Sequence, residues 1–372
     1  MRIRFYIESP QPGPGGAEQV VALLAEALSR QHDVVLVHHK SDALGESLVQ
    51  FSGCDLSRVK FQRVDKQPDH STQAASRWQR YRAAREWQRD LSEDCDLFVA
   101  VVHQAPPFSR ATNSALIVLF PTFQPGKRDW SWRRRLATYN VKFSISNFTR
   151  DWTRERWGVD SELLYPPVDL AHVEVLPKQK RILSVGRFST SGHTKRQIEL
   201  IETFRALCVS LSDWSYASVG GLNETLSDRL YFERARRLTH DQPIEVRANL
   251  ERAPLLALYR TASIFWHAAG FGENVAHAPE RAEHFGITTV EAMAHGCVPL
   301  VFAAGGQPEI VEDGVNGFVW REWSELKDRT VALARDQALL EKMSAAARAR
   351  SQIFSREKCV TRFCARVGIA TA

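Results

Sequence analysis

Short apolar runs alternate with longer amphipathic stretches along this chain, and the alternation begins twice. The first series opens with apolar runs at 1–8 and 32–39, separated by an amphipathic stretch at 17–31, and continues with runs at 95–103, 115–120 and 142–146. Strands buried on both faces read as nearly continuous apolar runs, and a helix between two strands allows them to pair in parallel. The pattern therefore predicts an α/β fold with a parallel sheet covered by helices on both faces.

The second series starts at residue 181 and repeats the same pattern. Its expected strands lie at 181–188, 214–220 and 244–250. Pro166 and Pro167 precede this restart, and proline interrupts both helices and central strands. A chain of 372 residues is also too long for one ordinary core. We therefore expect two Rossmann-like, doubly wound domains, 1–167 and 168–352, that face each other across a cleft.

Two cations lie where a ligand of the second domain would bind. Arg187 is near the end of the predicted strand 181–188, and Lys195 opens the next predicted helix after a glycine-bearing loop. Ligands of doubly wound sheets bind beyond the carboxyl ends of the strands. A forked guanidinium and a compact ammonium at that edge match a diphosphate. The alternative is that both side chains are merely solvated.

Two glutamates flank a glycine in EHFGITTVE, residues 283–291. The N–H groups around Gly286, Ile287 and Thr288 would open a helix, where they can point at an anion. Glu291 can accept hydrogen bonds from paired hydroxyls such as those of a ribose, and Glu283 would reach another part of the ligand. The alternative is that Glu291 only favours the helix dipole and Glu283 is solvated.

The histidines offer one further candidate. His103 ends an apolar run, where it would face the crevice and contact an acceptor, or it forms structural hydrogen bonds there. The remaining histidines, such as His267, His277, His284 and His295, do not have metal-site spacing.

A stretch at 270–282 contains GFGE, which resembles part of the glutamate motif. Neither Glu273 nor Glu280 has a second glutamate eight positions later, so only Glu283 forms the pair. The stretch is interpreted as an added loop near the bound ligand, either a lid or a plain surface insertion.

Basic and aromatic residues gather at 76–90 and 127–136. Cations with interfacial aromatics are typical of a protein resting on an anionic bilayer. A solvated helix with its aromatics turned into the core is the alternative. Aromatic side chains also stack on the bases of single-stranded nucleic acid, but no nucleic-acid fold signature accompanies the patches, so no nucleic-acid partner is expected.

The chain has no apolar run near the roughly 20 residues that a membrane span requires. Its first residues, MRIRFYIESPQPGPGG, also lack the apolar core of a signal peptide. We expect a cytoplasmic protein, with the cytoplasmic face of a membrane as the alternative location.

Four stretches of the chain belong together: PGPGGAE, SVGRF with HTK, EHFGITTVE, and EAMAHGCVPLVFAAGGQPEIVEDGVNGF. Together they resemble the retaining family 4 glycosyltransferases, which have the GT-B fold. FSREKCVTRF, at 354–363, resembles the family's last helix, which crosses back to the first domain. The resemblance covers essentially the whole chain and is weakest over 40–140. It implies that 353–372 returns to the first domain.

The resemblance also implies roles for individual residues. Arg187 and Lys195 would bind the donor diphosphate, Glu291 the ribose and Glu283 the transferred sugar. The implied donor site further includes Gly15, Gly16, Gly186, Phe285, Gly286, Ile287 and Thr288. No cofactor and no metal are implied, and the sequence has no evident carboxylate cluster for Mg²⁺. Many relatives have a histidine after the strand that follows His103, but this chain has Phe120, which leaves the acceptor side open.

These features predict a retaining hexosyltransferase that uses a nucleoside-diphosphate sugar and a glycan or lipid-linked acceptor. FPTFQP, SNFTRDWTRERW and LLYPPVD resemble the eukaryotic α-1,2-mannosyltransferases of dolichol-linked oligosaccharides, which favours GDP-mannose. The alternatives are a nucleotide-sugar epimerase or a phosphorylase of the same fold, or a catalytically inactive binding module.

Overall fold

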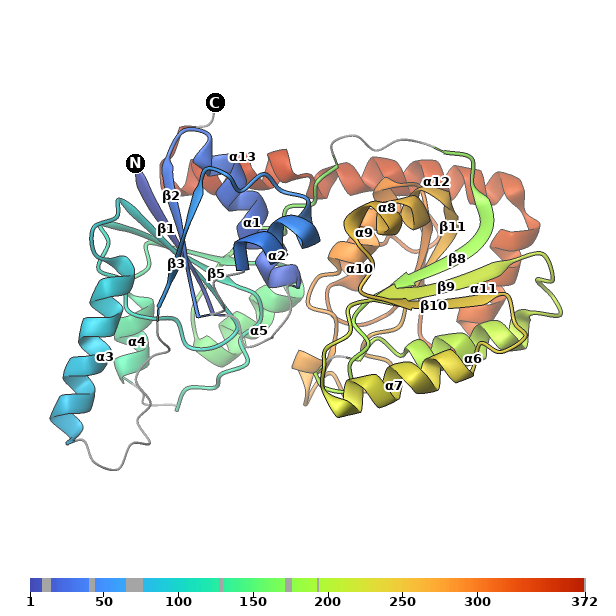
Figure 1. Cartoon of the computed structure of the whole chain (residues 1–372), viewed down its shortest axis with the longest axis horizontal. Helices are drawn as coiled ribbons and strands as arrows, with labels where there is room; N and C mark the ends of the chain where they lie inside the picture. The colour runs from blue at the N-terminus through green and yellow to red at the C-terminus, as the bar shows by residue number, and fades with distance from the viewer. Residues whose placement is uncertain are drawn as a thin grey trace. The chain divides into compact units, whose positions relative to one another are not determined.

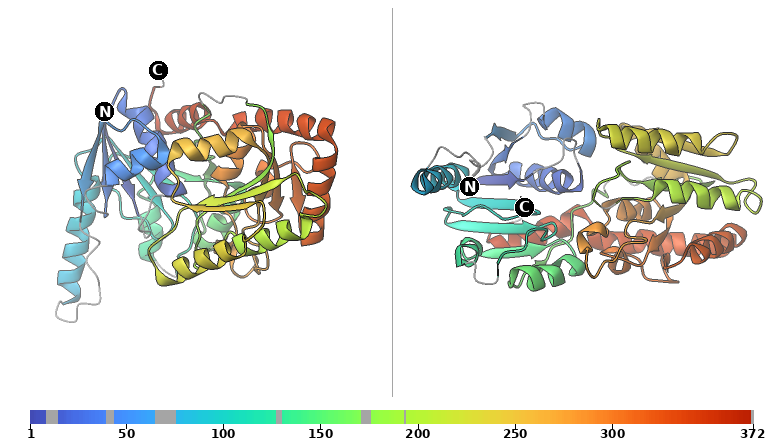
Figure 2. Two further views of the ribbon diagram at one scale, coloured as in Figure 1. Left: turned by 45° about the vertical axis from the view of Figure 1, so that its right-hand side comes forward. Right: turned by 90° about the horizontal axis from the view of Figure 1, so that it is seen from below.

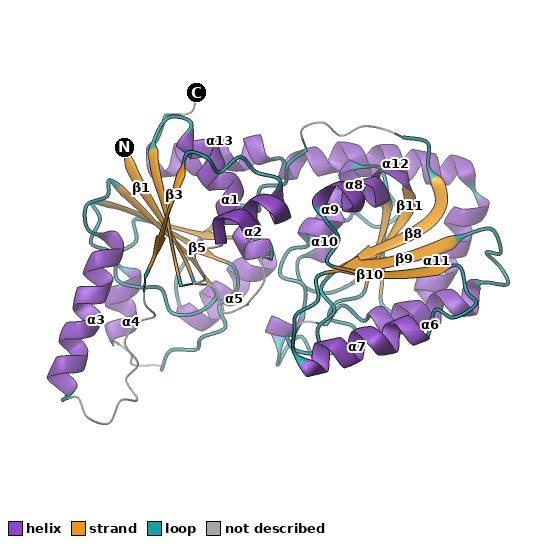
Figure 3. Cartoon of the chain, viewed as in Figure 1, coloured by secondary structure: helices purple, strands orange, loops and turns teal. Residues whose placement is uncertain are grey.

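The structure is a computed structural model that describes residues 1–8, 15–39, 44–64, 76–126, 130–170, 176–192 and 194–370. The chain forms two compact units, one of Met1–Pro167 with Glu357–Ala372 and one of Val168–Arg356. Each unit contains one parallel sheet (Figures 1 and 3). The glycine- and proline-rich residues 9–14 and the basic residues Lys127 and Arg128 lie outside the described residues.

The first unit has a seven-stranded parallel sheet in the order β3-β2-β1-β4-β5-β6-β7. Its strands are β1 (Arg2–Ile7), β2 (Asp33–His38), β3 (Val59–Arg63), β4 (Leu97–Val102), β5 (Asn113–Val118), β6 (Val141–Ser144) and β7 (Glu162–Leu163). Its helices are α1 (Gly16–Ser29), α2 (Leu44–Ser52), α3 (Arg77–Ser92), α4 (Trp130–Leu136), α5 (Asn147–Trp157) and α13 (Arg356–Val367). The strand order reverses between β1 and β4, which is where doubly wound sheets bind ligands.

Alternate residues of the central strands supply two separate cores. On β4, Phe98, Ala100 and Val102 pack with residues of α3, α4 and α5. The intervening residues of β4 are also fully buried, on the opposite face. A strand buried on both sides cannot alternate apolar with polar residues, which is why LFVAVV is apolar throughout. Figure 2 shows the helices on both sides of the strands.

The last helix, α13, belongs to the first unit although it ends the chain. The Phe363 ring packs against Phe143 of β6, with the ring centres 5.8 Å apart. The Asn113 side chain donates a hydrogen bond to the carbonyl of Val367 over 2.7 Å, and Arg366 pairs with Glu162. The C-terminal helix therefore contacts the N-terminal domain, as the sequence predicts.

The second unit has a six-stranded parallel sheet in the order β10-β9-β8-β11-β12-β13. Its strands are β8 (Gln179–Val185), β9 (Ser215–Gly220), β10 (Ile244–Ala248), β11 (Ala262–His267), β12 (Val298–Phe302) and β13 (Phe318–Trp320). Its α-helices are α6 (Gln197–Leu207), α7 (Leu226–Arg237), α8 (Arg252–Thr261), α9 (Ile287–Ala294), α10 (Gln307–Ile310), α11 (Trp323–Arg335) and α12 (Gln337–Ser351), with 3₁₀ turns η1 (Pro279–Arg281) and η2 (Gln352–Phe354). The order reverses between β8 and β11.

Side-chain alternation again separates the two faces of this sheet. Ile182 and Ile264 point into a core shared with α6, α7 and α11, whereas Leu183 and Phe265 point into a core shared with α8 and α9. Figure 1 shows α6 and α7 on one side of the strands and α8 and α9 on the other. The two-sided α/β architecture that the sequence predicts is confirmed. Most element ends differ from the expected ones by one or two residues, and β3, β7 and β13 are additional strands.

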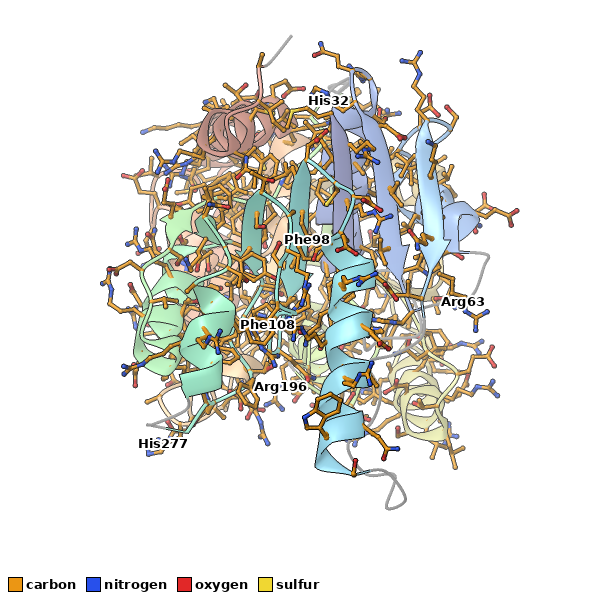
Figure 4. The ribbon with its side chains drawn as sticks, turned by 90° about the vertical axis from the view of Figure 1, so that its left-hand side faces the viewer. His32, Arg63, Phe98, Phe108, Arg196 and His277 are labelled. Atoms are coloured by element: carbon orange, nitrogen blue, oxygen red, sulfur yellow. The ribbon has the colours of Figure 1, made fainter. Side chains whose placement is uncertain are left out.

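The two basic stretches differ in how they present their aromatic rings. On α3, Trp78 is 65% exposed and Arg82 lies over its ring, with 5.2 Å between the guanidinium carbon and the ring centre. Figure 4 shows α3 standing out from the rest of the first unit. On α4, Trp132 is only 4% exposed and belongs to the core. For Trp132 the alternative of an aromatic residue turned into the core therefore applies, because its indole packs beside Trp157.

Candidate active site

A small pocket lies where β8 and β11 end side by side, at the reversal point of the second sheet. It is lined by the ends of both strands and by the loop before α6, including Gly186, Lys195, Gln197, Trp266 and His267. Carboxyl ends of parallel strands at a reversal point form the usual ligand crevice of such sheets. The pocket is therefore the candidate active site of this unit.

Lys195 and His267 line this pocket, and both contact Glu283. The Lys195 ammonium forms an ion pair with Oε2 of Glu283, and Nε2 of His267 lies 3.1 Å from the same oxygen. These three side chains are 18%, 14% and 3% exposed, respectively. Low exposure weakens screening by water, so the carboxylate is held by both neighbours. The sequence placed Lys195 at the start of a helix, but the helix begins two residues later, at Gln197.

His267 is neutral in this environment. Burial lowers the pKa of His267 below its ordinary value, and this effect outweighs the opposing influence of Glu283. A neutral imidazole donates from one nitrogen only, and contact with a carboxylate assigns that proton to Nε2. The buried Nδ1 is then an acceptor, and it has no hydrogen-bond partner within the described part of the chain.

Close backbone packing positions the loop between β8 and α6. A methyl group on Gly186 would lie 2.6 Å from Cγ of Lys195, so only glycine lets that side chain pass. Gln197 donates hydrogen bonds to the carbonyls of Gly186 and Arg187 over 3.0 and 2.9 Å. The methylene chain of Arg187 runs over Gly221, where an added methyl would lie 3.1 Å from Cγ. Gly186 and Lys195 line the pocket, with Arg187 the next residue along the chain.

A second loop presents Glu283. Gly286 has a φ of +118° and caps the start of α9. A methyl there would lie 2.0 Å from Nε2 of Gln307, whose amide donates to the carbonyl of Phe285 over 3.0 Å. The backbone N–H of Gly306 donates to the carbonyl of Glu283 over 2.8 Å. This packing fixes the entry to α9, where the N–H groups of Ile287 and Thr288 lie in the first turn.

Glu291 is on α9 and is 4% exposed. Its Oε1 pairs with Arg252 over 2.8 Å, and its Oε2 accepts a hydrogen bond from the Tyr259 hydroxyl over 3.0 Å. Burial disfavours the charge on Arg252, but Glu291 outweighs burial and the pKa of Arg252 is raised. A carboxylate oxygen has two lone pairs and can accept more than one hydrogen bond. The solvated alternative is wrong for Glu283, because its side chain is largely buried and paired with Lys195. Glu291 is likewise buried and paired with Arg252, so its contacts are not limited to the helix dipole.

Three predicted residues lie in the first unit. Gly15 precedes α1, and its N–H donates to the Glu18 carboxylate over 2.9 Å, while Gly16 is the first residue of that helix. His103 follows β4 and is partly buried, and its carbonyl accepts hydrogen bonds from the N–H and hydroxyl of Thr122. These residues lie at the carboxyl edge of their own sheet.

The sequence reasoning missed several residues of the second-unit site. His267 was set aside for lack of metal spacing, although it lies at the carboxyl end of a strand, as His103 does, and could have been found by the same rule. No sequence pattern connected Arg252 and Tyr259 with Glu291, since both are far from it in sequence. Gly305, Gly306 and Gln307 lie in the matched segment but had no assigned role.

Among the residues that the structure describes, no three His, Cys, Asp or Glu side chains are grouped as metal ligands would be. Within the same residues, no helix has both the length and the apolarity needed to cross a membrane.

Two family models match this chain and identify the family to which it belongs. Residues 14–172 match the model described as Glycosyltransferase Family 4, and residues 171–350 match the model described as Glycosyl transferases group 1. This chain belongs to the family 4 glycosyltransferases. The site built around Lys195, Glu283 and Glu291 lies in the region of the second match.

Individual relatives of this family 4 chain are distant. A GDP-Man:Man(3)GlcNAc(2)-PP-Dol alpha-1,2-mannosyltransferase from Dictyostelium discoideum is 26% identical over 189 residues, which is 46% of this chain and 35% of that protein. The chain therefore spans well under two thirds of that relative. HepE from Anabaena, in complex with UDP, has a TM-score of 0.72 and 17% identity, covering 99% of this chain and 100% of HepE. A glycosyltransferase from Rickettsia africae has a TM-score of 0.71 and 15% identity, covering 98% and 97%. These likenesses show the GT-B fold.

Proposed function

We propose that this family 4 protein is a retaining hexosyltransferase that uses a nucleoside-diphosphate sugar. The observation that supports this most directly is the contact among Lys195, Glu283 and His267 at the reversal point of the second sheet. Lys195 is a cation that can bind a phosphate, and Glu283 is a carboxylate that can bind sugar hydroxyls. The two side chains are in direct contact. Intact Glu291 and Arg187 also argue against an inactive binding module.

In this proposal Lys195 and Arg187 bind the diphosphate, and Glu291 binds the ribose. The leaving nucleoside diphosphate gains negative charge as the glycosidic bond breaks. Fixed cations and the N–H groups of Ile287 and Thr288 aimed at that charge lower the barrier without requiring a metal. Burial strengthens each of these interactions, since little water competes for them.

Retention of configuration is consistent with attack from the face that the diphosphate leaves. The departing phosphate oxygen then accepts the proton of the acceptor hydroxyl, while the new glycosidic bond forms and the old one breaks. Glu283 would orient the sugar through its hydroxyls rather than attack the anomeric carbon. Gly15 and Gly16 are proposed to bind the donor, and His103 is proposed to contact the acceptor.

The proposed donor and acceptor come from a partial match to a relative. The partial match to a mannosyltransferase that uses GDP-mannose and a dolichol-linked acceptor favours mannose and a lipid-linked glycan. HepE, in contrast, binds UDP. A thermal-shift panel of GDP-mannose, UDP-glucose and related donors tests this, because a ligand that binds only the folded state raises the melting temperature. A larger shift with UDP-sugars would overturn the GDP assignment.

The exposed part of α3 is proposed to rest on an anionic membrane surface at its cytoplasmic face. Trp78 and Arg82 present an aromatic ring and a cation together, as an interfacial anchor does. Arg133 and Arg134 of α4 are exposed and add positive charge. Such a location would suit an enzyme with a lipid-linked acceptor.

Replacement of Lys195 tests the site itself. Lys195→Ala should weaken nucleoside diphosphate binding by about 1.5 to 3 kcal/mol, the value of a hydrogen bond to a charged group. Titration calorimetry with GDP and UDP measures this, and unchanged affinity would remove Lys195 from the donor site. Acceptor-dependent release of nucleoside diphosphate by the unmodified protein excludes both an epimerase and an inactive module, and a requirement for inorganic phosphate would indicate a phosphorylase.

A further inference from the structure

The segment 270–282, between β11 and Glu283, has an ordered structure of its own. Phe271 packs among Phe302, Trp320 and Trp323, with ring centres 5.3, 5.8 and 4.6 Å away. Backbone hydrogen bonds such as Glu273 N–H to the Gly270 carbonyl close successive turns. The segment is therefore anchored to the second unit.

Glu273 on this segment joins two cations. Its Oε1 lies 2.7 Å from Nη2 of Arg196, and its Oε2 lies 2.9 Å from Nη1 of Arg281. Glu273 and Arg196 are 17% and 23% exposed, whereas Arg281 is 56% exposed. Arg196 also contacts Glu199 of α6, over 3.2 Å. Arg196 is labelled in Figure 4, as is His277, which lies with Glu273 on the segment 270–282.

Arg196 is adjacent in sequence to Lys195 and has an unusual backbone. Its φ of +57° and ψ of +37° are in the left-handed region, which non-glycine residues rarely adopt. Such a conformation persists when surrounding contacts over-determine it. The ion pairs of Arg196 with Glu273 and Glu199 supply those contacts at the turn that directs the Lys195 side chain toward the pocket.

Donor binding would change the partner of Lys195 but not that of Arg196. If Lys195 binds the diphosphate and Glu283 binds the sugar, their mutual ion pair must loosen. The Arg196–Glu273 pair involves neither ligand-binding side chain, so it would persist and keep the turn in place. The two pairs link the same two loops, since Lys195 and Arg196 are adjacent and Glu273 precedes Glu283 by ten positions.

We propose that Glu273 is a positioning residue that holds the Lys195 ammonium at the diphosphate site through its ion pair with Arg196. This inference rests on the proposed function and assigns the segment 270–282 a part in donor binding. The segment then acts as a fixed brace rather than a lid.

Three variants test the proposal by titration calorimetry with whichever of GDP or UDP binds the unmodified protein more tightly. Glu273→Ala and the isosteric Glu273→Gln should each weaken binding by about fivefold or more, within the range for coupled neighbours. Arg281→Ala is the matched control, because it removes only the exposed partner, and it should leave the affinity within about twofold. Thermal unfolding confirms that each variant is folded.

The decisive readout is a double-mutant cycle with Lys195→Ala. If Glu273 acts through Lys195, then Glu273→Ala adds little further loss once Lys195 is alanine. If Glu273 has a purely structural role, Glu273→Ala weakens binding equally in the unmodified protein and in Lys195→Ala, and this result would overturn the inference. Unchanged affinity in both single Glu273 variants would also overturn it. If Lys195→Ala alone leaves the affinity unchanged, Lys195 does not bind the diphosphate, and that part of the proposed function is refuted. The positioning role of Glu273 is then refuted as well, because it depends on Lys195.

Discussion

Replacement of Gly305 by alanine should displace Glu283 without touching its side chain. A methyl group at Gly305 would lie 1.9 Å from the carbonyl oxygen of Glu283, whereas ordinary contacts begin at 3.4 Å. The two atoms therefore need about 1.5 Å more separation, 3.4 minus 1.9. Backbone flanks both sides of this contact, so the strain falls on the loop that carries Glu283. A misplacement of about 1 Å at a reacting group can cost about 100-fold in rate, or about 2.7 kcal/mol.

Gly314→Ala is the matched control for this variant. Gly314 has a φ of +74°, close to the +66° of Gly305, but an added methyl there would meet no atom within 4 Å. Both variants carry the cost of a left-handed alanine, about 1 to 2 kcal/mol of folding stability. Only Gly305→Ala should also lose turnover, measured as acceptor-dependent nucleoside diphosphate release by protein shown to be folded from its melting curve. Equal turnover of the two folded variants would refute the reasoning.

Three further outcomes are expected. His267→Leu should lower kcat by about 10-fold or more, because it loses a hydrogen bond to the Glu283 carboxylate, and the nucleoside diphosphate affinity should be nearly unchanged. His267→Gln can still donate to that carboxylate and should retain most of the activity. Equal activity of the two variants would contradict this prediction. Burial lowers the pKa of both His267 and His295 below the ordinary 6.5, so the unfolded chain binds more protons and the free energy of unfolding should fall as pH drops below 6.5. Urea titrations across that range should show a smaller loss for His267→Gln, and an identical loss would count against His267. Binding to anionic liposomes should become weaker with added salt and in the Trp78→Ala variant. Binding that is absent or insensitive to salt would contradict the membrane proposal.

The sequence predicted the fold well because its signal is local. Parallel strands buried on both faces are mostly apolar, so LFVAVV in β4 and ASIFWH in β11, which is polar only at Ser263 and His267, stand out from their surroundings. The restart at β8 separated two sheets for the same reason. The short edge strands β3, β7 and β13 were missed, because an edge strand is partly exposed and its pattern is weaker.

The sequence by itself determined which residue types carry charge beside which strand ends: Arg187 and Lys195 after β8, and Glu283 and Glu291 around Gly286. Only the tertiary structure decided their partners. Lys195 meets Glu283, 88 positions away, and Arg252 meets Glu291, 39 positions away. Chain spacing encodes which side chains share a helix or a strand end, but ion pairs between loops depend on how separate strands are ordered in the sheet. The reversal between β8 and β11 brings the loops that carry Lys195 and Glu283 together.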